Sequence, residues 1–453
     1  MLQNKMRCAF CILLLKGGSN SSGQQTLTSR PLHSCLDRTK TLFLLSATIL
    51  MTSVIAVAPL HLQQQLAFAS SSDAAATDSD NNSTFVGSNS QIIAATTSVR
   101  PESIAVNPNT GIVYVANWID YLANTTGAFG ASGSISVING SSTELMSYIA
   151  LDGAPLKMAV NPNTGMVYVT ESRNNLVAVI DGTANKVIDT IRVGNRPAGV
   201  AVNPNTNMVY VANWNYPDGF VSVINGSTNS IVANVTLGTG ASYGIAVNPN
   251  TNKVYVDSFA YSRNGSNIVS VIDGSTNKVV ANVTVGALNY VVRTGVSTFP
   301  DAFRYGVDIA VNPKTNMIYT DNNYVSVIDG AVNKVVANVT LDSLPLRAIS
   351  VNPETNLVYV PNSEGNIQVI DGSTNEVMGM MKLGGVISDV VFNPNTDKLF
   401  VASETSVNKA SVIITDDSNI QRVPEFPAYF LTIISLAIPL AISVGYARYR
   451  KLC

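Results

Sequence analysis

Histidine and cysteine, the side chains that carry most acid–base, thiol and transition-metal chemistry in proteins, lie only towards the ends of this sequence. The two histidines and four cysteines are His33, His61, Cys8, Cys11, Cys35 and Cys453. Residues 70–427 therefore contain neither an imidazole nor a thiol. For that region this excludes histidine catalysis, cysteine nucleophiles, disulfides, haem ligation, and zinc or copper sites of the usual ligand types.

The chemistry left to residues 70–427 is that of carboxylates, tyrosine, lysine and arginine. No pair of these stands at a diagnostic catalytic spacing, and we predict no catalytic residue, no metal ligand and no cofactor. A calcium site built from aspartate and backbone oxygens stays open as an alternative, since Ca²⁺ needs only oxygen ligands. Aspartates scattered through turns more often serve the turn itself.

Aromatic side chains mixed with charged ones occupy several connections between the apolar segments. The candidate binding residues are Trp118, Asp120, Tyr121, Trp214, Tyr216, Asp218, Phe259, Tyr261, Arg263, Tyr290, Arg293, Asp301, Phe303 and Arg304. Rings beside acidic, amide and guanidinium groups suit stacking on sugar faces or anchoring a protein partner. The alternative is that these aromatics fold inward and pack their own long loops.

The elements that position these residues come from one repeated phrase, Asn-Pro-x-Thr-(Asn/Gly/Asp), followed two residues later by Tyr-Val or a close variant. Its prolines are Pro108, Pro162, Pro204, Pro249, Pro313, Pro353 and Pro394. The prolines stand 40 to 64 residues apart. A unit of this size cannot bury its own apolar face, so neighbouring units must stack, and seven copies suggest a closed ring.

Each repeat except the seventh contains four short apolar runs rich in β-branched residues, as residues 199–237 illustrate. Asn, Pro, Gly, Asp and Thr separate the runs, which predicts four antiparallel strands joined by turns. The strands alternate incompletely between apolar and polar residues, as expected for sheets covered on both faces. The Asn-Pro turns and the third-to-fourth turns hardly vary, whereas the connections at the opposite strand ends carry most of the variation in length.

The two ends of the repeat region complement each other. The seventh repeat has a third strand over residues 410–415, but no fourth strand follows it. Residues 92–97 resemble that missing strand and precede the first Asn-Pro unit. Pairing the two segments would close a ring and remove exposed sheet edges. We therefore predict an all-β fold, a seven-bladed β-propeller of four-stranded antiparallel blades over residues 91–417.

The repeated phrase also resembles a known family. The segments 114–117, 168–171, 210–213 and 359–362, each followed by a strand and an Asp-Gly-like turn, are similar to the YVTN β-propeller repeat. This resemblance covers about residues 91–417 and implies an extracytoplasmic or surface-layer propeller, a group that mostly lacks an assigned reaction. No catalytic motif carries over from it. The copies at 255–258, 319–322 and 400–403 depart from the pattern.

The N-terminal segment 1–69 is typical of an export signal. An apolar run over 41–59 follows Arg38 and Lys40 and leads to Ala67-Phe68-Ala69, which suits cleavage after Ala69. The alternative is an uncleaved N-terminal membrane anchor. Residues 70–90 are rich in Ser, Asp and Asn and predict a flexible linker.

The C-terminal segment is typical of a membrane anchor. After a linker over 418–427, the uncharged run 428–447 is long enough to cross a bilayer as a helix, and the basic tail 448–453 should stay in the cytoplasm. The motif at 424–427, Pro-Glu-Phe-Pro, resembles the PEF-type sorting signal of archaeal surface proteins. That resemblance implies, as an alternative, that the tail is cut and the protein is attached by other means.

Charge and glycosylation motifs agree with an exported domain. Nearly all of the 29 acidic residues, but only about two thirds of the 27 basic ones, lie within 70–427, which argues against binding to nucleic acid. Within residues 91–417, Asn-x-Ser/Thr motifs begin at Asn124, Asn139, Asn225, Asn234, Asn264, Asn282 and Asn338. Such motifs accept glycans in exported chains, although here they also belong to the repeated turns and strands.

We expect a membrane-anchored, extracytoplasmic binding module that recognises a protein or an envelope glycan through its aromatic-rich loops. One alternative is an enzyme of the lactonase or lyase propeller type acting in a central funnel, but such enzymes rely on histidine or on clustered acidic metal ligands. Another is a structural surface-layer component that associates laterally with copies of itself.

Overall fold

The computed structural model describes the chain over residues 91–97, 100–118, 133–215, 219–259, 266–287, 308–321, 324–343, 345, 348–406, 409–417 and 420–422. Chain contacts divide the protein into two units, residues 1–81 and 82–453, and all described residues belong to the second. The segments predicted as export signal, flexible linker and membrane helix lie outside the described residues. Within the described part, no helix is long and apolar enough to span a membrane.

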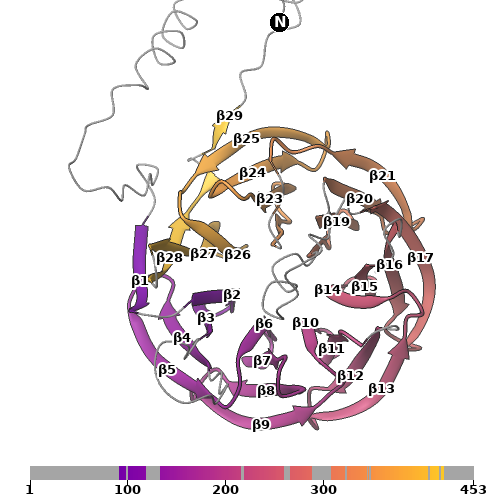
Figure 1. Cartoon of the computed structure of the whole chain (residues 1–453), viewed down its shortest axis with the longest axis horizontal. Coiled ribbons are helices and arrows are strands. Elements are labelled where there is room, and N and C mark those ends of the chain that lie inside the picture. The colour runs from indigo at the N-terminus through magenta and orange to yellow at the C-terminus, as the bar shows by residue number, and fades with distance from the viewer. Residues whose placement is uncertain are drawn as a thin grey trace, which may run out of the picture. The chain divides into compact units, whose positions relative to one another are not determined.

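Seven antiparallel sheets, the blades, surround one axis (Figure 1). The first three blades, each given from its innermost to its outermost strand, are β2 (Arg100–Val106), β3 (Ile112–Trp118), β4 (Gly133–Asn139) and β5 (Leu145–Leu151); β6 (Pro155–Val160), β7 (Met166–Glu171), β8 (Leu176–Asp181) and β9 (Lys186–Arg192); β10 (Pro197–Asn203), β11 (Met208–Asn213), β12 (Phe220–Asn225) and β13 (Ser230–Thr236).

Blades 4 to 7 continue the same order around the ring. Their strands are β14 (Ala241–Asn248), β15 (Lys253–Phe259), β16 (Ser266–Asp273) and β17 (Lys278–Ala287); β18 (Ile309–Asn312), β19 (Met317–Asp321), β20 (Val325–Asp329) and β21 (Lys334–Val339); β22 (Ser350–Asn352), β23 (Leu357–Pro361), β24 (Asn366–Asp371) and β25 (Glu376–Lys382); β26 (Val386–Asn393), β27 (Lys398–Ser406), β28 (Lys409–Thr415) and β1 (Gln91–Thr97).

The N-terminal strand closes the ring as the sequence predicts. β1 pairs antiparallel with β28, with Ile92 opposite Ile413 and Thr97 opposite Lys409. Because β1 occupies the fourth place of blade 7, the edge of β28 is covered by a strand from the other end of the repeat region. The predicted all-β, seven-bladed propeller with four-stranded blades is confirmed.

Blade 6 carries one strand more than the sequence predicts. Residues 421 and 422, which the sequence assigns to the linker 418–427, form β29 (Gln421–Arg422) and pair with β25. The reason is that the outermost strand of a blade presents unpaired backbone groups, which a passing segment of the same chain can satisfy. The chain thus adds a fifth strand to blade 6 after it has completed blade 7.

The repeated turn sequence is explained by backbone conformation. The last residue of Asn-Pro-x-Thr-(Asn/Gly/Asp) is left-handed in every blade, for example φ 71° at Gly111, 55° at Asn207 and 55° at Asp397. Gly, Asn and Asp are the residues that adopt this region at the least cost. The asparagine before the proline caps the turn, as where Asn203 Oδ1 accepts a hydrogen bond from the backbone N–H of Asn205 (3.0 Å).

The tyrosine in the second strand of a blade explains why the third-to-fourth turn of the next blade contains glycine. A Cβ placed on Gly182 would lie 2.5 Å from the Tyr114 hydroxyl, and the same relation links Tyr319 to Gly372. The third-to-fourth turn therefore keeps glycine wherever a tyrosine from the preceding blade abuts it. Blade 7 lacks this glycine, and there the Tyr359 hydroxyl donates to Asp417 instead (2.6 Å).

The core lies between the blades rather than within them. Seven hydrophobic clusters each join two neighbouring blades, and the cluster that contains Phe400 and Val113 joins blade 7 to blade 1. Each sheet is thus buried on both faces. This explains why the strands carry apolar residues on both sides.

The outer strands of blades 1 to 6 share a β-bulge at the same register. The bulged residues are Met146, Ile188, Val232, Val280, Val336 and Met378. The first five are exposed, with between 49% and 53% of their surface open to solvent. Bulges distort an edge and so hinder pairing with other strands.

The ring has two unlike faces. We call the face of the Asn-Pro turns and third-to-fourth turns the turn face, and the opposite face, where second-to-third and fourth-to-first connections emerge, the loop face. On the turn face each Asn-Pro turn bonds to the next, as where Asn203 Nδ2 donates to Asn252 Oδ1 (2.7 Å) and Asn395 Nδ2 to the Pro108 carbonyl (2.7 Å). The second of these bonds links blade 7 back to blade 1.

Candidate functional site: the axial cavity and the loop face

One position of the repeat lies five residues before the proline of each Asn-Pro pair, within the innermost strand or one or two residues before it. The seven residues there are Ser103, Lys157, Gly199, Gly244, Asp308, Ala348 and Asp389. All except Ala348 line a cavity of about 180 Å³ to which all seven blades contribute. The cavity therefore lies on the axis of the ring, and three of its wall residues carry charge.

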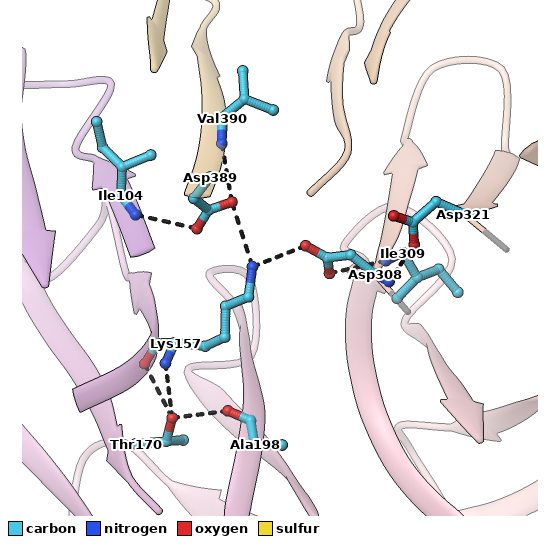
Figure 2. A network of polar contacts seen from close by, with 9 residues as sticks. All are labelled: Ile104, Lys157, Thr170, Ala198, Asp308, Ile309, Asp321, Asp389 and Val390. Atoms are coloured by element: carbon cyan, nitrogen blue, oxygen red, sulfur yellow. Dashed lines mark hydrogen bonds and ion pairs between the residues drawn. The ribbon is translucent and has the colours of Figure 1, made fainter. Parts of the chain in front are cut away.

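Lys157 joins blades across the axis (Figure 2). Its Nζ lies 3.0 Å from Asp308 Oδ2 and 3.4 Å from Asp389 Oδ1, and all three side chains are less than a fifth exposed. The backbone of Lys157 is also fixed, since its N–H donates to Thr170 Oγ1 (3.0 Å), which in turn donates to the Ala198 carbonyl (2.8 Å). An ammonium from blade 2 thus bridges carboxylates from blades 5 and 7.

Asp389 also receives backbone donors. The N–H of Ile104 donates to Asp389 Oδ2 (3.1 Å) and the N–H of Val390 to Oδ1 (3.0 Å). Because Ile104 belongs to blade 1, this carboxylate ties the last blade to the first at the axis. Figure 2 shows the carboxylate between these donors and Lys157.

Asp308 belongs to a second group of buried carboxylates in blades 4 and 5. Its backbone N–H donates to Asp321 Oδ1, and the N–H of Asp321 donates back to the Asp308 carbonyl (3.2 Å). Asp257 is fully buried and accepts a hydrogen bond from the Thr320 hydroxyl at Oδ2. Among the described residues, nothing hydrogen-bonds to Asp257 Oδ1.

These neighbours set the protonation of the cluster. Burial alone would lower the pKa of Lys157, but the charges of Asp308 and Asp389 outweigh it and raise the pKa. Burial raises the pKa of Asp257 to about 7, with Thr320 opposing and Asp308 adding to the rise. Burial and the charge of Asp308 also hold the pKa of Asp321 well above its usual range. Lys157 thus pairs with Asp308 and Asp389, whereas the raised pKa values of Asp257 and Asp321 favour the protonated forms of these two carboxyl groups.

This arrangement favours an electrostatic role over nucleophilic chemistry. A lysine whose pKa is raised stays charged and is a poor nucleophile, since covalent catalysis by lysine needs the neutral amine. In the part of the chain that the structure describes, no three acidic, histidine or cysteine side chains are placed to hold a metal ion. With a pKa raised by burial to about 7, Asp257 changes its charge near neutral pH.

Of the candidate binding residues, Trp214 is buried. It is 6% exposed, packs with Leu156 and Ala198, and its ring meets that of Tyr243 edge-on at 6.1 Å. Tyr243 in turn lines the axial cavity. Trp214 therefore packs inward, as the alternative interpretation of the aromatic residues expects, and it supports the cavity wall through Tyr243.

Trp118 stands at the end of β3, half-buried on the loop face. The guanidinium carbon of Arg173 lies 5.0 Å from the centre of its ring, a cation–π contact between blades 1 and 2. Both side chains keep part of their surface open, and Arg173 is exposed. The sequence identifies Trp118 but gives no sign of its arginine partner.

Phe259 ends β15, where its backbone pairs with Ala241 of β14. The remaining candidates lie outside the described residues: Asp120, Tyr121, Tyr216, Asp218, Tyr261, Arg263, Tyr290, Arg293, Asp301, Phe303 and Arg304. They stay predictions.

The charged axial residues are absent from the sequence-based candidates. A signal for them exists: when the seven repeats are aligned on their Asn-Pro turns, Lys157, Asp308 and Asp389 share one register with glycine, alanine and serine. A charge inside an otherwise apolar strand is rarely fully buried unless paired. Alignment within the chain could therefore have indicated the cluster, although not which blades it joins.

Comparison with known proteins identifies the fold. A solved chain described as Kuenenia stuttgartiensis Hydrazine Synthase is similar with a TM-score of 0.58 and 16% sequence identity, over 72% of this chain and 97% of that one. No family model matches the sequence, and no curated protein matches it. At this level of identity the likeness shows the β-propeller fold alone.

Proposed function

We propose that the protein is a binding module, exported and anchored at the cell surface, that recognises an envelope glycan or a protein through the loop face of its propeller. The observation that carries this proposal is the contrast between the two faces. The turn face is bonded from blade to blade by near-identical turns. The loop face bears the connections that vary, which is where repeat folds build recognition surfaces.

The size of the axial cavity also favours the loop face. At about 180 Å³ it is smaller than the roughly 300–1,000 Å³ of ordinary small-molecule pockets. Lys157 and its two carboxylate partners further occupy its wall with satisfied charges. The cavity therefore suits a rigid support beneath the loop face better than a pocket for a large ligand.

The resemblance to YVTN repeats, the apolar segments 41–59 and 428–447, and the acidic composition of the repeat region support the surface location. With segment 428–447 in the membrane, the propeller would stand outside the cell. Protease digestion of intact cells tests this part: a surface protein is cleaved without lysis, and a chain that is cut only after lysis contradicts it.

Binding is tested with two matched double variants of the full chain, assayed on immobilised polysaccharide and on protein fractions purified from the envelope of the same cells. Trp118→Ala with Arg173→Ala removes the paired side chains from the loop face, and we expect at least about tenfold weaker binding. Lys314→Ala with Glu354→Ala removes an exposed ion pair from the turn face and should bind as the wild type does. Equal binding by both variants, or none by the wild type, would contradict the proposal.

A further inference from the structure

Blades 3, 4 and 5 carry the same Asn-Val-Thr motif at the same place in their outer strands. The motifs begin at Asn234, Asn282 and Asn338, each directly opposite a serine of the third strand: Ser222, Ser270 and Ser326. Blades 1 and 2 have Tyr148 and Thr190 at the equivalent place and no motif. The repeat fold therefore does not itself require asparagine there.

The three asparagines share one geometry. Each serine is fully buried, and its hydroxyl donates to the asparagine Oδ1 at 3.0, 2.9 and 3.0 Å in turn. Each asparagine is exposed. In a carboxamide the oxygen and the nitrogen point to opposite sides of the same carbon, so an oxygen held against the blade leaves Nδ2 facing outward.

The orientation of the carboxamide is fixed by a third residue in blade 3. Asn213 Nδ2 donates to Ser222 Oγ (3.1 Å), so the serine uses its own proton for the next partner. That partner, Asn234, must then offer an acceptor, which only its oxygen can do. Because Asn213 donates to Ser222 and Ser222 donates to Asn234 Oδ1, the Nδ2 atom of Asn234 faces outward.

The hydroxyl residue of the motif is also accessible. Thr236, Thr284 and Thr340 are exposed and lie two residues after each asparagine, which places both side chains on one side of the strand. The valine between them is buried, at 5% exposure in all three blades. Asparagine and threonine therefore face solvent together while the intervening residue anchors the strand.

We propose that Asn234, Asn282 and Asn338 are N-glycosylated. The donor would be a glycan linked through phosphate to a lipid, transferred by a membrane glycosyltransferase of the same cell. The asparagine nitrogen bonds to the anomeric carbon, the bond from that carbon to the phosphate oxygen breaks, the nitrogen loses one proton, and the lipid phosphate leaves with the electron pair. This inference rests on the proposed export of the chain.

The fold tolerates this modification without loss of a contact. The glycan is attached to Nδ2, whereas the serine uses Oδ1, so each Ser–Asn hydrogen bond survives. The sugars would lie beside the exposed, bulged residues Val232 and Val280 at the rim. They would cover apolar surface there and leave both faces of the ring open.

The motifs in the turns have a different explanation. Asn225 Oδ1 accepts a hydrogen bond from the Ser227 N–H (2.9 Å), and blades 2 and 4 have Asp181 and Asp273 in the same role. The turn needs only the oxygen of this side chain. The proposal therefore concerns the three strand sites.

The test is peptide mass spectrometry on the full chain isolated from the cells that produce it. We expect a glycan mass on each of the three peptides. Thr236→Val, Thr284→Val and Thr340→Val should each abolish the modification at its own site alone, whereas Thr→Ser at the same positions should retain it. Neither change touches the asparagine or its serine partner.

The outcomes separate the inference from the function on which it rests. Protease digestion of intact cells is run on the same samples. Unmodified peptides from a chain that is cleaved on intact cells would overturn glycosylation and leave the surface location standing. Unmodified peptides from a chain protected until lysis would overturn both. A glycan that persists in the Thr→Val variants would overturn the assignment of these motifs as its acceptors.

Discussion

The turn face and the axial cavity are made by the same seven repeats and differ in how those repeats cooperate. At the turn face each blade makes nearly the same hydrogen bonds to the next, as Asn203 to Asn252 and Asn312 to Asn356 show. At the axis Lys157, Asp308 and Asp389 come from blades 2, 5 and 7, and their equivalents elsewhere carry no charge. The contacts that all blades share close the ring. The charged cluster that the described residues form at its centre arises because three blades differ from the others at one position.

The largest expected effect is at the axis. Lys157→Ala leaves Asp308 and Asp389 buried without their counterion, and we expect a loss of about 3–5 kcal/mol in unfolding free energy. Urea unfolding of the purified chain measures it. The matched control is Lys314→Ala, whose exposed pair with Glu354 should contribute less than about 1 kcal/mol. Equal losses of unfolding free energy in the two lysine variants would contradict the expected difference between the axis and the turn face.

The cavity wall comes next. Trp214→Ala removes a buried ring from its contacts with Leu156 and Tyr243, and we expect a loss of about 3 kcal/mol. Trp118→Ala, at the equivalent place in blade 1, removes a half-buried ring and its cation–π contact and should cost about 1 kcal/mol. Thermal unfolding of both variants measures the difference. A Trp214 variant as stable as the Trp118 variant would show that the wall does not depend on this ring.

The pH dependence of stability separates the regions again. The pKa of Asp257 is about 7 in the fold and about 4 in an unfolded chain, so its contribution is fully present below pH 4 and is lost as the pH rises through 7. From pH 5 to pH 8 we expect the unfolding free energy to fall by roughly 2–3 kcal/mol. Asp257→Asn, which keeps an acceptor for Thr320, should flatten the curve measured by urea unfolding. If the unfolding free energy of this variant falls with pH as steeply as that of the wild type, a group other than Asp257 causes the pH dependence.

The smallest effects concern the turns. Asn203→Ala and Asn312→Ala each remove a hydrogen bond between neighbouring turns and the cap within their own turn, and we expect about 1–2 kcal/mol for each. The two sites share no partner, so the double variant should lose the sum, whereas Lys157→Ala and Asp308→Ala should be strongly non-additive. A double-mutant cycle by urea unfolding checks both. Coupling between the two turns would mean that the turn face acts as one unit.

The sequence contains enough to predict the ring but not its centre. The Asn-Pro turns repeat, and residues 92–97 complete the count of strands, so the number of blades and the closure follow from local patterns. The contact between Lys157 and Asp308 spans 151 residues and depends on the angle between blades, which no local pattern encodes. The sequence also does not predict that Trp214 is buried and Trp118 only half-buried, because the partner of Trp214 is Tyr243 of the next blade.

The pairing of β1 with β28 has a consequence for the order in which the protein is made. β1 precedes all other strands of the described residues and its partner β28 is one of the last, so β1 must wait while six blades are synthesised. Contacts between such distant segments form slowly, because the entropy of the long intervening chain opposes them. A chain released early would hold a free N-terminal strand and no partner for it. We therefore expect newly made protein to be most prone to aggregate just before β28 emerges.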